Sequence, residues 1–237
     1  MNYSKGLKFG YGVFETLSYD GILEDFDLHM ERLQRSLIVL KMLPVDEDTI
    51  RMEALEALKN TQHNAIRISV YAHDNQLITY ETRISKQNET YNVCFSDLKR
   101  HSSNPLLNIK TSAHLNYFLE KMEMSSKGYD EALHFNERDE LTEGIYTNVF
   151  FVKDQKVYTP STTCGLLEGI YRNKVIDKLK KLGIPIKMGY YYKEDIVSAD
   201  EVFLTNSLIK IIPVFRIEEI DYDSNNYITQ RLMKEML

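Results

Sequence analysis

The sequence predicts an α/β protein of the α+β kind, built as two domains with mixed or antiparallel sheets. First, 237 residues are enough for two modest domains with proper cores. Second, strand-like runs follow one another through connections too short for the crossover helices of a doubly wound parallel sheet. Third, a polar, proline-containing segment near residue 100 separates two stretches of different texture. We therefore expect a smaller N-terminal domain over residues 1–100, a linker over 101–109 and a larger C-terminal domain over 110–237.

The elements of the first domain follow from turn chemistry and hydrophobic periodicity. Residues 13–26 hold two apolar runs joined at Tyr19-Asp20-Gly21, which predicts a β-hairpin because Asp-Gly suits a tight turn. Asp27 is expected to cap a helix that Pro44 ends. The apolar residues that share one face of this helix are Met30, Leu33, Leu37 and Leu40. A second helix is expected at residues 50–58, and strands at 65–71, 77–84 and 91–96.

The second domain alternates helices and strands. Leu115, Phe118, Leu119 and Met122 recur at helical spacing, which predicts an amphipathic helix that ends at Gly128. A second helix is expected to end at Gly183. The remaining expected elements are a strand at 132–135, a hairpin over 149–158 turning at Lys153-Asp154, the second helix at 172–182, strands at 202–205 and 211–217, and a helix at 227–237.

Composition narrows the class of partner. A net charge of −6 and a pI near 5.6 argue against a nucleic-acid or anionic-membrane partner and leave a small-molecule substrate. Cys94 and Cys164 are too few and too far apart for a disulfide framework, and the six histidines show no zinc-like spacing, so no metal is expected. The N-terminus lacks an apolar signal core and no apolar run reaches membrane length, which predicts a cytoplasmic location.

Three separated blocks carry the most specific signal. They begin at Glu143 (EGIYTNVF), Val157 (VYTP) and Leu167 (LEGIYR), and upstream of them Lys110 precedes the run Gly-Tyr-Asp-Glu-Ala that ends at Ala132. At compatible spacings, these blocks resemble the signature of the class IV aminotransferase family of pyridoxal-phosphate (PLP) enzymes. The resemblance covers nearly the whole chain. It implies the family's two-domain fold, with pyridoxal 5'-phosphate in the cleft between the domains, and a homodimer.

The chemistry of PLP assigns expected roles to two residues. The family's lysine bonds to the cofactor aldehyde and later moves protons at the substrate carbon, and Lys110 matches that position. An acidic residue faces the pyridine nitrogen and keeps the ring protonated, and Glu143 matches it. The resemblance thus makes Lys110 the catalytic residue.

The cofactor phosphate needs a cradle of its own. Gly169 and the two residues after it immediately precede an expected helix, so their backbone amides point out of a helix N-terminus, which binds anions well. By resemblance, the amides of Ile170 and Tyr171 bind the phosphate. Arg32 matches the family's phosphate arginine, and Ser207 matches its last phosphate or ring contact.

Within the family, residues 200–208 with Pro213-Val214 are most similar to the aminodeoxychorismate lyases, which implies cleavage of 4-amino-4-deoxychorismate to 4-aminobenzoate and pyruvate for folate synthesis. The chain departs from many relatives at Tyr11, Tyr71-Ala72, Ala113 and Tyr171. Most of these changes fall where substrate would be bound. A transaminase acting on D-amino or branched-chain amino acids, and a protein that keeps the fold but has lost catalysis, therefore stay open as alternatives.

Overall fold

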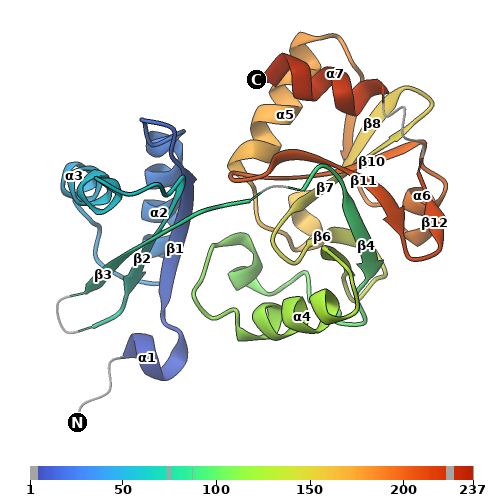
Figure 1. The fold of residues 1–237 in the computed structure, drawn as a ribbon. Coiled ribbons are helices and arrows are strands. Elements are labelled where there is room, and N and C mark those ends of the chain that lie inside the picture. Colours follow the sequence, from blue (N-terminus) through green and yellow to red (C-terminus); the bar gives the residue numbers. More distant parts are fainter. Residues whose placement is uncertain (1–4, 74–75, 87, 223–226, 237) are drawn as a thin grey trace. The chain divides into compact units, whose positions relative to one another are not determined.

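The computed structural model describes residues 5–73, 76–86, 88–222 and 227–236 (Figure 1). The chain forms two compact units, one of Met1–Lys86 with Ile109–Leu115 and the other of Gln87–Asn108 with Asn116–Leu237. This division differs from the predicted one. The strand near residue 93 and most of the predicted linker, up to residue 108, belong to the second unit, and the short segment that carries Lys110 belongs to the first.

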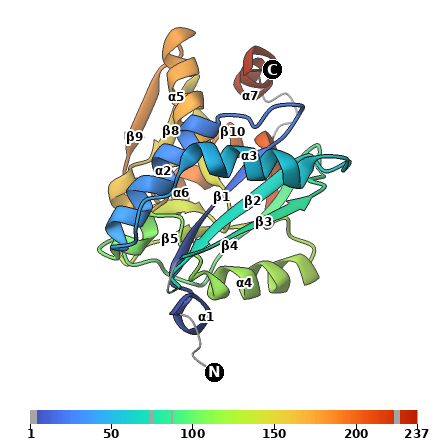
Figure 2. The same ribbon diagram turned by 90° about the vertical axis from the view of Figure 1, so that its left-hand side faces the viewer.

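The first unit is a small antiparallel sheet with two helices on one face (Figure 2). Its elements are α1 (Lys5–Phe9), β1 (Gly12–Ser18), α2 (Phe26–Val39), α3 (Glu47–Leu58), β2 (Ala65–Tyr71) and β3 (Leu77–Arg83). The strands lie in the order β1-β2-β3. Met30, Leu33 and Leu37 of α2 are buried against the sheet, as the helical spacing predicts.

The predicted hairpin over residues 13–26 is wrong. After β1 the chain makes one isolated bridge, between Tyr19 and Leu23, and then enters α2 directly. Asp25, with a left-handed φ of 52°, is the residue at the N-cap position in place of Asp27. The helix also ends before Pro44, because Lys41 adopts a left-handed φ of 54°. Asp27 therefore lies inside the helix instead of capping it, and Pro44 lies beyond its last residue.

The second unit contains a nine-stranded mixed sheet. Its strands are β4 (Tyr91–Phe95), β5 (Glu131–Phe135), β6 (Leu141–Gly144), β7 (Asn148–Lys153), β8 (Lys156–Pro160), β9 (Ile186–Gly189), β10 (Glu201–Asn206), β11 (Lys210–Ile217) and β12 (Ile220–Asp221). The order is β6-β5-β4-β11-β10-β7-β8-β9, with β12 paired to β11. β4 runs parallel to β5 and β11, β8 runs parallel to β9, and the other pairs are antiparallel. The predicted mixed-sheet α/β class is confirmed.

Helices cover this sheet on both faces (Figure 1). They are α4 (Leu115–Ser126), α5 (Ile170–Lys181), α6 (Lys193–Val197) and α7 (Tyr227–Met236), with short 3-10 turns η1 (Pro105–Asn108) and η2 (Thr162–Cys164). On one face, α5 and α7 bury Val175, Leu179 and Leu232 against Phe150 and Phe203, whose rings stack with centroids 4.9 Å apart. The other face holds a second cluster that includes Ile196 of α6.

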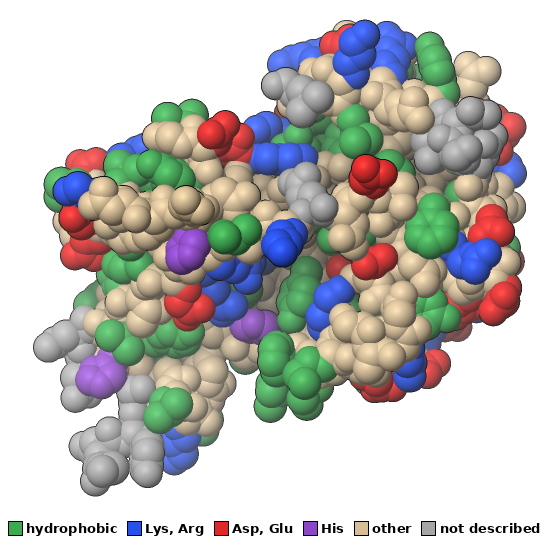
Figure 3. Space-filling model, viewed as in Figure 1, with side chains coloured by type: hydrophobic (Ala, Val, Ile, Leu, Met, Phe, Trp, Pro, Cys, Tyr) green, Lys and Arg blue, Asp and Glu red, His purple; other side chains and the backbone are tan. Residues whose placement is uncertain are grey.

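The predicted amphipathic helix is present as α4, but much of its apolar face is exposed. Phe118 and Leu119 are each 53% exposed and Met122 is 57% exposed. Hydrophobic side chains gather over this helix on the molecular surface (Figure 3). Helical spacing correctly predicted the helix, but these three side chains add little to the core of their unit.

Candidate active site

Lys110 lies beside the first strand of its unit. The carbonyl oxygen of Lys110 accepts a hydrogen bond from the backbone N–H of Phe14, at 3.0 Å, and Thr111 bridges to Val13. Its Nζ atom lies 4.6 Å from the centroid of the Phe14 ring. These contacts fix the backbone of Lys110 on β1 and place its amine over an aromatic face.

Two further basic side chains meet the same ring. The Arg67 guanidinium of β2 lies 3.7 Å from the Phe14 centroid, and the His114 ring lies 5.0 Å from it. Burial, together with the charges of Arg67 and Lys110, lowers the pKa of His114, so this imidazole is neutral at neutral pH. The surroundings of Lys110 are therefore basic and partly apolar.

Arg32 belongs to a buried charged cluster in the same unit. Its Nε and Nη2 donate to the two carboxylate oxygens of Glu15, at 2.8 and 2.7 Å, and His29 contacts Glu15 at 2.7 Å. All three side chains are buried. Burial alone would raise the pKa of Glu15, but Arg32 and His29 lower it to about 2. Glu15 therefore stays ionised and fixes the orientation of the Arg32 guanidinium.

Glu143 lies on the short strand β6 and is 8% exposed. Its carboxylate pairs with Arg100 and accepts hydrogen bonds from the Asn148 side chain and the Leu167 backbone N–H, each at 3.1 Å. Arg100, itself buried, also donates to the carbonyl oxygen of Gly144, at 3.0 Å. A buried carboxylate held by several donors keeps a fixed direction, as an acid that faces a cofactor ring must.

The predicted phosphate segment forms the start of α5. Gly169 is the N-cap residue, and Ile170 and Tyr171 begin the helix. The first N–H groups of a helix have no partner within the helix, and they form the positive end of its dipole. A Cβ atom at Gly169 would lie 2.0 Å from the Asn148 side-chain oxygen, so glycine is what allows this helix end to lie against Asn148.

Ser207 lies in the turn between β10 and β11. Two residues before Ser207, Thr205 of β10 has a buried hydroxyl oxygen with no hydrogen-bond partner among the described residues. Lys210 follows the turn, and its Nζ lies 5.5 Å from the Tyr171 ring centroid. The start of α5 and the β10–β11 turn thus bring hydroxyl, amide and ammonium groups into one region of the second unit.

Sequence reasoning missed the residues that hold the predicted ones in place. Asn148 donates to Glu143 and lies against Gly169, so it joins the acidic and the helix-end parts of the site. Arg100, Glu15, Phe14 and Arg67 were also not predicted. Asn148 lies inside the block that begins at Glu143, and its place there was the only signal. Arg100, Glu15, Phe14 and Arg67 contact residues that are distant from them in the sequence.

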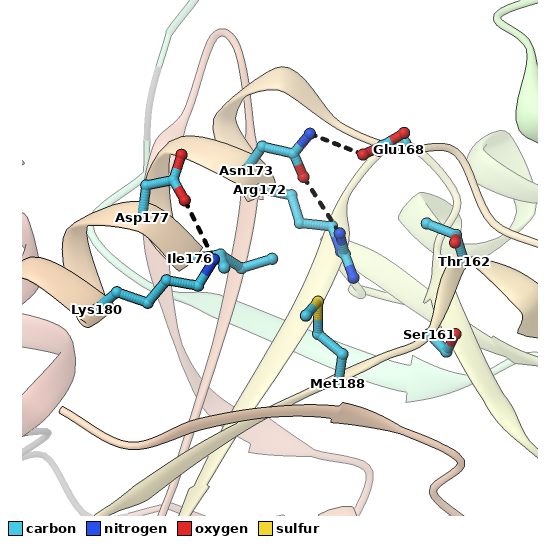
Figure 4. Close-up of a pocket in the computed structure, with 9 residues that line it drawn as sticks. All are labelled: Ser161, Thr162, Glu168, Arg172, Asn173, Ile176, Asp177, Lys180 and Met188. Atoms are coloured by element: carbon cyan, nitrogen blue, oxygen red, sulfur yellow. Dashed lines mark hydrogen bonds and ion pairs between the residues drawn. The ribbon is translucent and has the colours of Figure 1, made fainter.

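A shallow cavity of about 420 Å³ lies elsewhere on the second unit, beside α5 (Figure 4). It is lined by Arg172, Asn173 and Lys180 of the helix and by Met188 of β9, among others. Arg172 donates to the carbonyl oxygen of Pro160, at 2.9 Å, and to Asn173, at 3.3 Å. None of the sequence-predicted site residues lines this cavity, and its polar groups largely pair with one another.

Known proteins resemble this chain along most of its length. The model of the amino-transferase class IV family matches residues 12–217. Aminodeoxychorismate lyase of Bacillus subtilis is 30% identical in an alignment that covers 94% of this chain and 83% of the relative. D-alanine aminotransferase of Listeria innocua is 26% identical over 91% of this chain and 81% of its own length.

Solved structures agree with the sequence relatives. The branched-chain aminotransferase of Thermoproteus uzoniensis, solved with norvaline, superposes with a TM-score of 0.87 at 26% identity. The match covers 98% of this chain and 86% of that chain. Among the described residues, no helix is long and apolar enough to cross a membrane. The predicted family, fold and cofactor are confirmed: this chain belongs to the class IV aminotransferase family and is a PLP-dependent enzyme.

Proposed function

We propose that this enzyme is a 4-amino-4-deoxychorismate lyase that forms 4-aminobenzoate and pyruvate, a step of folate synthesis. The observation that carries the proposal is the similarity to the Bacillus subtilis lyase over 94% of the chain. The likeness of residues 200–208 to the lyases supports it as well. Each unit also carries side chains that are suited to the cofactor.

The side chains present fit PLP. Glu143 is a buried carboxylate with fixed donors, suited to the pyridine nitrogen. The amides of Ile170 and Tyr171 at the start of α5, the Ser207 hydroxyl and the Arg32 guanidinium are suited to the phosphate. The unpartnered, buried Thr205 oxygen beside Ser207 is a further polar atom that a phosphate oxygen or its water would satisfy.

Each residue has a distinct task in the proposed reaction. When bound, PLP supplies an electron sink for the carbon that carries the substrate amine. Lys110 would hold the cofactor through its amine and, once freed by the substrate amine, would take the proton from that carbon. Glu143 keeps a proton on the pyridine nitrogen.

The electron pair left by the proton then breaks the bond from the neighbouring ring carbon to the ether oxygen. The three-carbon fragment leaves with that oxygen and becomes pyruvate, while the ring becomes aromatic. The gain in aromatic stability drives the step, so no second substrate is required.

A transaminase is the second candidate, favoured by the similarity to D-alanine aminotransferase and to the branched-chain enzyme. Both reactions use Lys110 in the same way, so the form of the cofactor distinguishes them. With D-alanine or a branched-chain amino acid alone, a transaminase converts PLP to pyridoxamine phosphate and needs a keto acid to recover. A lyase keeps its cofactor as PLP during turnover. Rapid, complete conversion by either amino acid would favour the transaminase.

The proposal includes a cytoplasmic homodimer, as the family resemblance implies. The exposed apolar side chains Phe118, Leu119 and Met122 of α4 support a dimer, because a second copy would remove them from water. Sedimentation of the wild type and of Phe118→Ser/Met122→Ser would test whether this face belongs to the interface. A monomeric wild type would contradict the dimer.

A further inference from the structure

The buried polar groups behind Glu143 extend well beyond Arg100. The Arg100 guanidinium contacts Glu143 through Nη1, and its Nη2 lies 3.5 Å from Nδ1 of His134 on β5. The other ring nitrogen of His134, Nε2, lies 2.8 Å from Glu120 of α4. Ser96 donates to the second Glu120 oxygen. All these side chains are less than one-tenth exposed.

The hydrogen-bond pattern fixes the state of His134. An ionised Glu120 can only accept hydrogen bonds, so Nε2 of His134 carries the proton and donates it to Glu120. Nδ1 is then the acceptor that faces Arg100. Burial and the charge of Arg100 lower the pKa of His134, while the hydrogen bonds from His134 and Ser96 outweigh burial and lower the pKa of Glu120. The imidazole is therefore neutral between an anion and a cation at neutral pH.

Contacts on the other sides leave Arg100 few alternative orientations. The Tyr117 ring of α4 lies 4.7 Å from its guanidinium carbon and packs edge-on against His134, with centroids 5.9 Å apart. Thr142 donates to the carbonyl oxygen of His134, at 3.0 Å, which ties β5 to β6 beside Glu143. Glu120, Tyr117, Arg100 and Glu143 are thus the titratable or charged groups that surround the His134 imidazole.

We propose that His134 and Glu120 are positioning residues, which hold Arg100 in the orientation that binds Glu143 and so fix the carboxylate that serves the cofactor. This inference rests on the proposed role of Glu143 and adds two residues that do not touch the cofactor. Loss of the imidazole removes the contact that holds Arg100 on the His134 side and leaves Glu120 with Ser96 as its remaining side-chain donor. Arg100 is then held less firmly against Glu143, and the pyridine nitrogen holds its proton less well.

The test compares His134→Leu, which removes both hydrogen bonds, with His134→Gln, whose amide can donate to Glu120 and accept from Arg100. His63→Leu is the matched control, since the His63 imidazole bonds to Thr82, at 2.7 Å, in the other unit. The main readout is the pH midpoint of the visible absorbance of bound PLP. If the pyridine nitrogen loses its proton, the nitrogen that links Lys110 to the cofactor keeps its own proton to higher pH, because the two charges no longer repel.

We expect His134→Leu to move this midpoint to higher pH and to lower kcat roughly 10-fold with KM little changed. His134→Gln and His63→Leu should both keep the wild-type midpoint. A wild-type midpoint in His134→Leu, or the same shift in His134→Gln as in His134→Leu, would overturn the inference. If His134→Leu fails to fold, Glu120→Gln/His134→Leu removes the unpaired carboxylate and carries the same expectation.

The result is separable from the proposed reaction. If the wild type binds PLP but forms no 4-aminobenzoate, the lyase proposal fails, and the absorbance midpoints still decide the role of His134. If the wild type forms 4-aminobenzoate and His134→Leu matches it in midpoint and kcat, the positioning role fails alone.

Discussion

Arg32 donates to both carboxylate oxygens of Glu15, through Nε at 2.8 Å and Nη2 at 2.7 Å, inside the first unit. This two-point contact sets the plane of the guanidinium that we assign to the cofactor phosphate. The same contact ties the cofactor site to the stability of the unit, because both side chains are buried.

Glu15→Gln is expected to destabilise the protein by about 3–5 kcal/mol, because it leaves the Arg32 charge buried without a counter-charge. Urea unfolding at pH 7 measures the change. Asp27→Asn is the control, since Asp27 pairs with Arg51 while 87% exposed, and its loss should cost less than about 1 kcal/mol. Equal effects of the two substitutions would contradict the buried-pair account.

The Glu15 carboxylate should also make the first unit less stable in acid. Its pKa falls from 4.5 to about 2 on folding, so its stabilising contribution is complete above pH 4.5 and is lost as the pH falls toward 2. That contribution amounts to about 3 kcal/mol. The free-energy difference between wild type and Glu15→Gln should therefore shrink across this window, and a constant difference would be the contrary result.

The Glu131 carboxyl should make the stability depend on pH in the opposite direction. It is buried on β5, and desolvation raises its pKa from 4.5 to about 7. The folded protein therefore binds a proton that the unfolded chain has released, and stability is lost as the pH rises from 4.5 through 7. Glu131→Gln keeps an oxygen for the Ile145 and Tyr146 amides but cannot titrate.

Relative to wild type, we expect Glu131→Gln to gain about 3 kcal/mol in unfolding free energy between pH 4.5 and pH 8. Chemical unfolding of both proteins at several pH values measures this gain. The prediction is wrong if the two curves run parallel.

Lys110 is predicted to carry the cofactor. Borohydride should fix PLP covalently on the peptide that contains Lys110, and Lys110→Ala should lose both the label and turnover. Lys127→Ala, which removes an exposed lysine paired with Glu123, should keep both. Peptide mapping by mass spectrometry gives the site, and label on another lysine would refute the assignment.

Glu143→Gln should still bind PLP but slow proton abstraction by roughly 10- to 100-fold, because a neutral amide holds the pyridinium proton poorly. Stopped-flow measurement of substrate deprotonation separates this step from binding. Glu194→Gln, at an exposed position of α6, is the control. Full turnover in Glu143→Gln would remove Glu143 from its assigned role.

Sequence patterns predicted the elements whose signals are local. β2 occupies residues 65–71 as expected, since its β-branched and other apolar residues alternate with Arg67 and Ser69. The helix expected at 172–182 is present as α5, but it begins two residues earlier, at Ile170. The strand that carries Glu143 was not predicted, because β6 has only four residues and lies next to a polar stretch.

The residues that hold the site residues in place were harder to predict from the sequence than the site residues themselves. Arg100 is the last residue of the predicted N-terminal domain, next to the predicted linker, yet it is 6% exposed and paired with Glu143, 43 positions away in the second unit. His134 occupies a position that strand alternation alone would fill with an apolar residue. Such contacts depend on which strands become neighbours in the sheet, and one sequence does not contain that information.

The most direct test of the central claim is a product assay with 4-amino-4-deoxychorismate and no added keto acid. We expect 4-aminobenzoate and pyruvate in equal amounts, with the cofactor remaining as PLP and with no product from Lys110→Ala. Absence of 4-aminobenzoate from a wild-type protein that is loaded with PLP would contradict the claim.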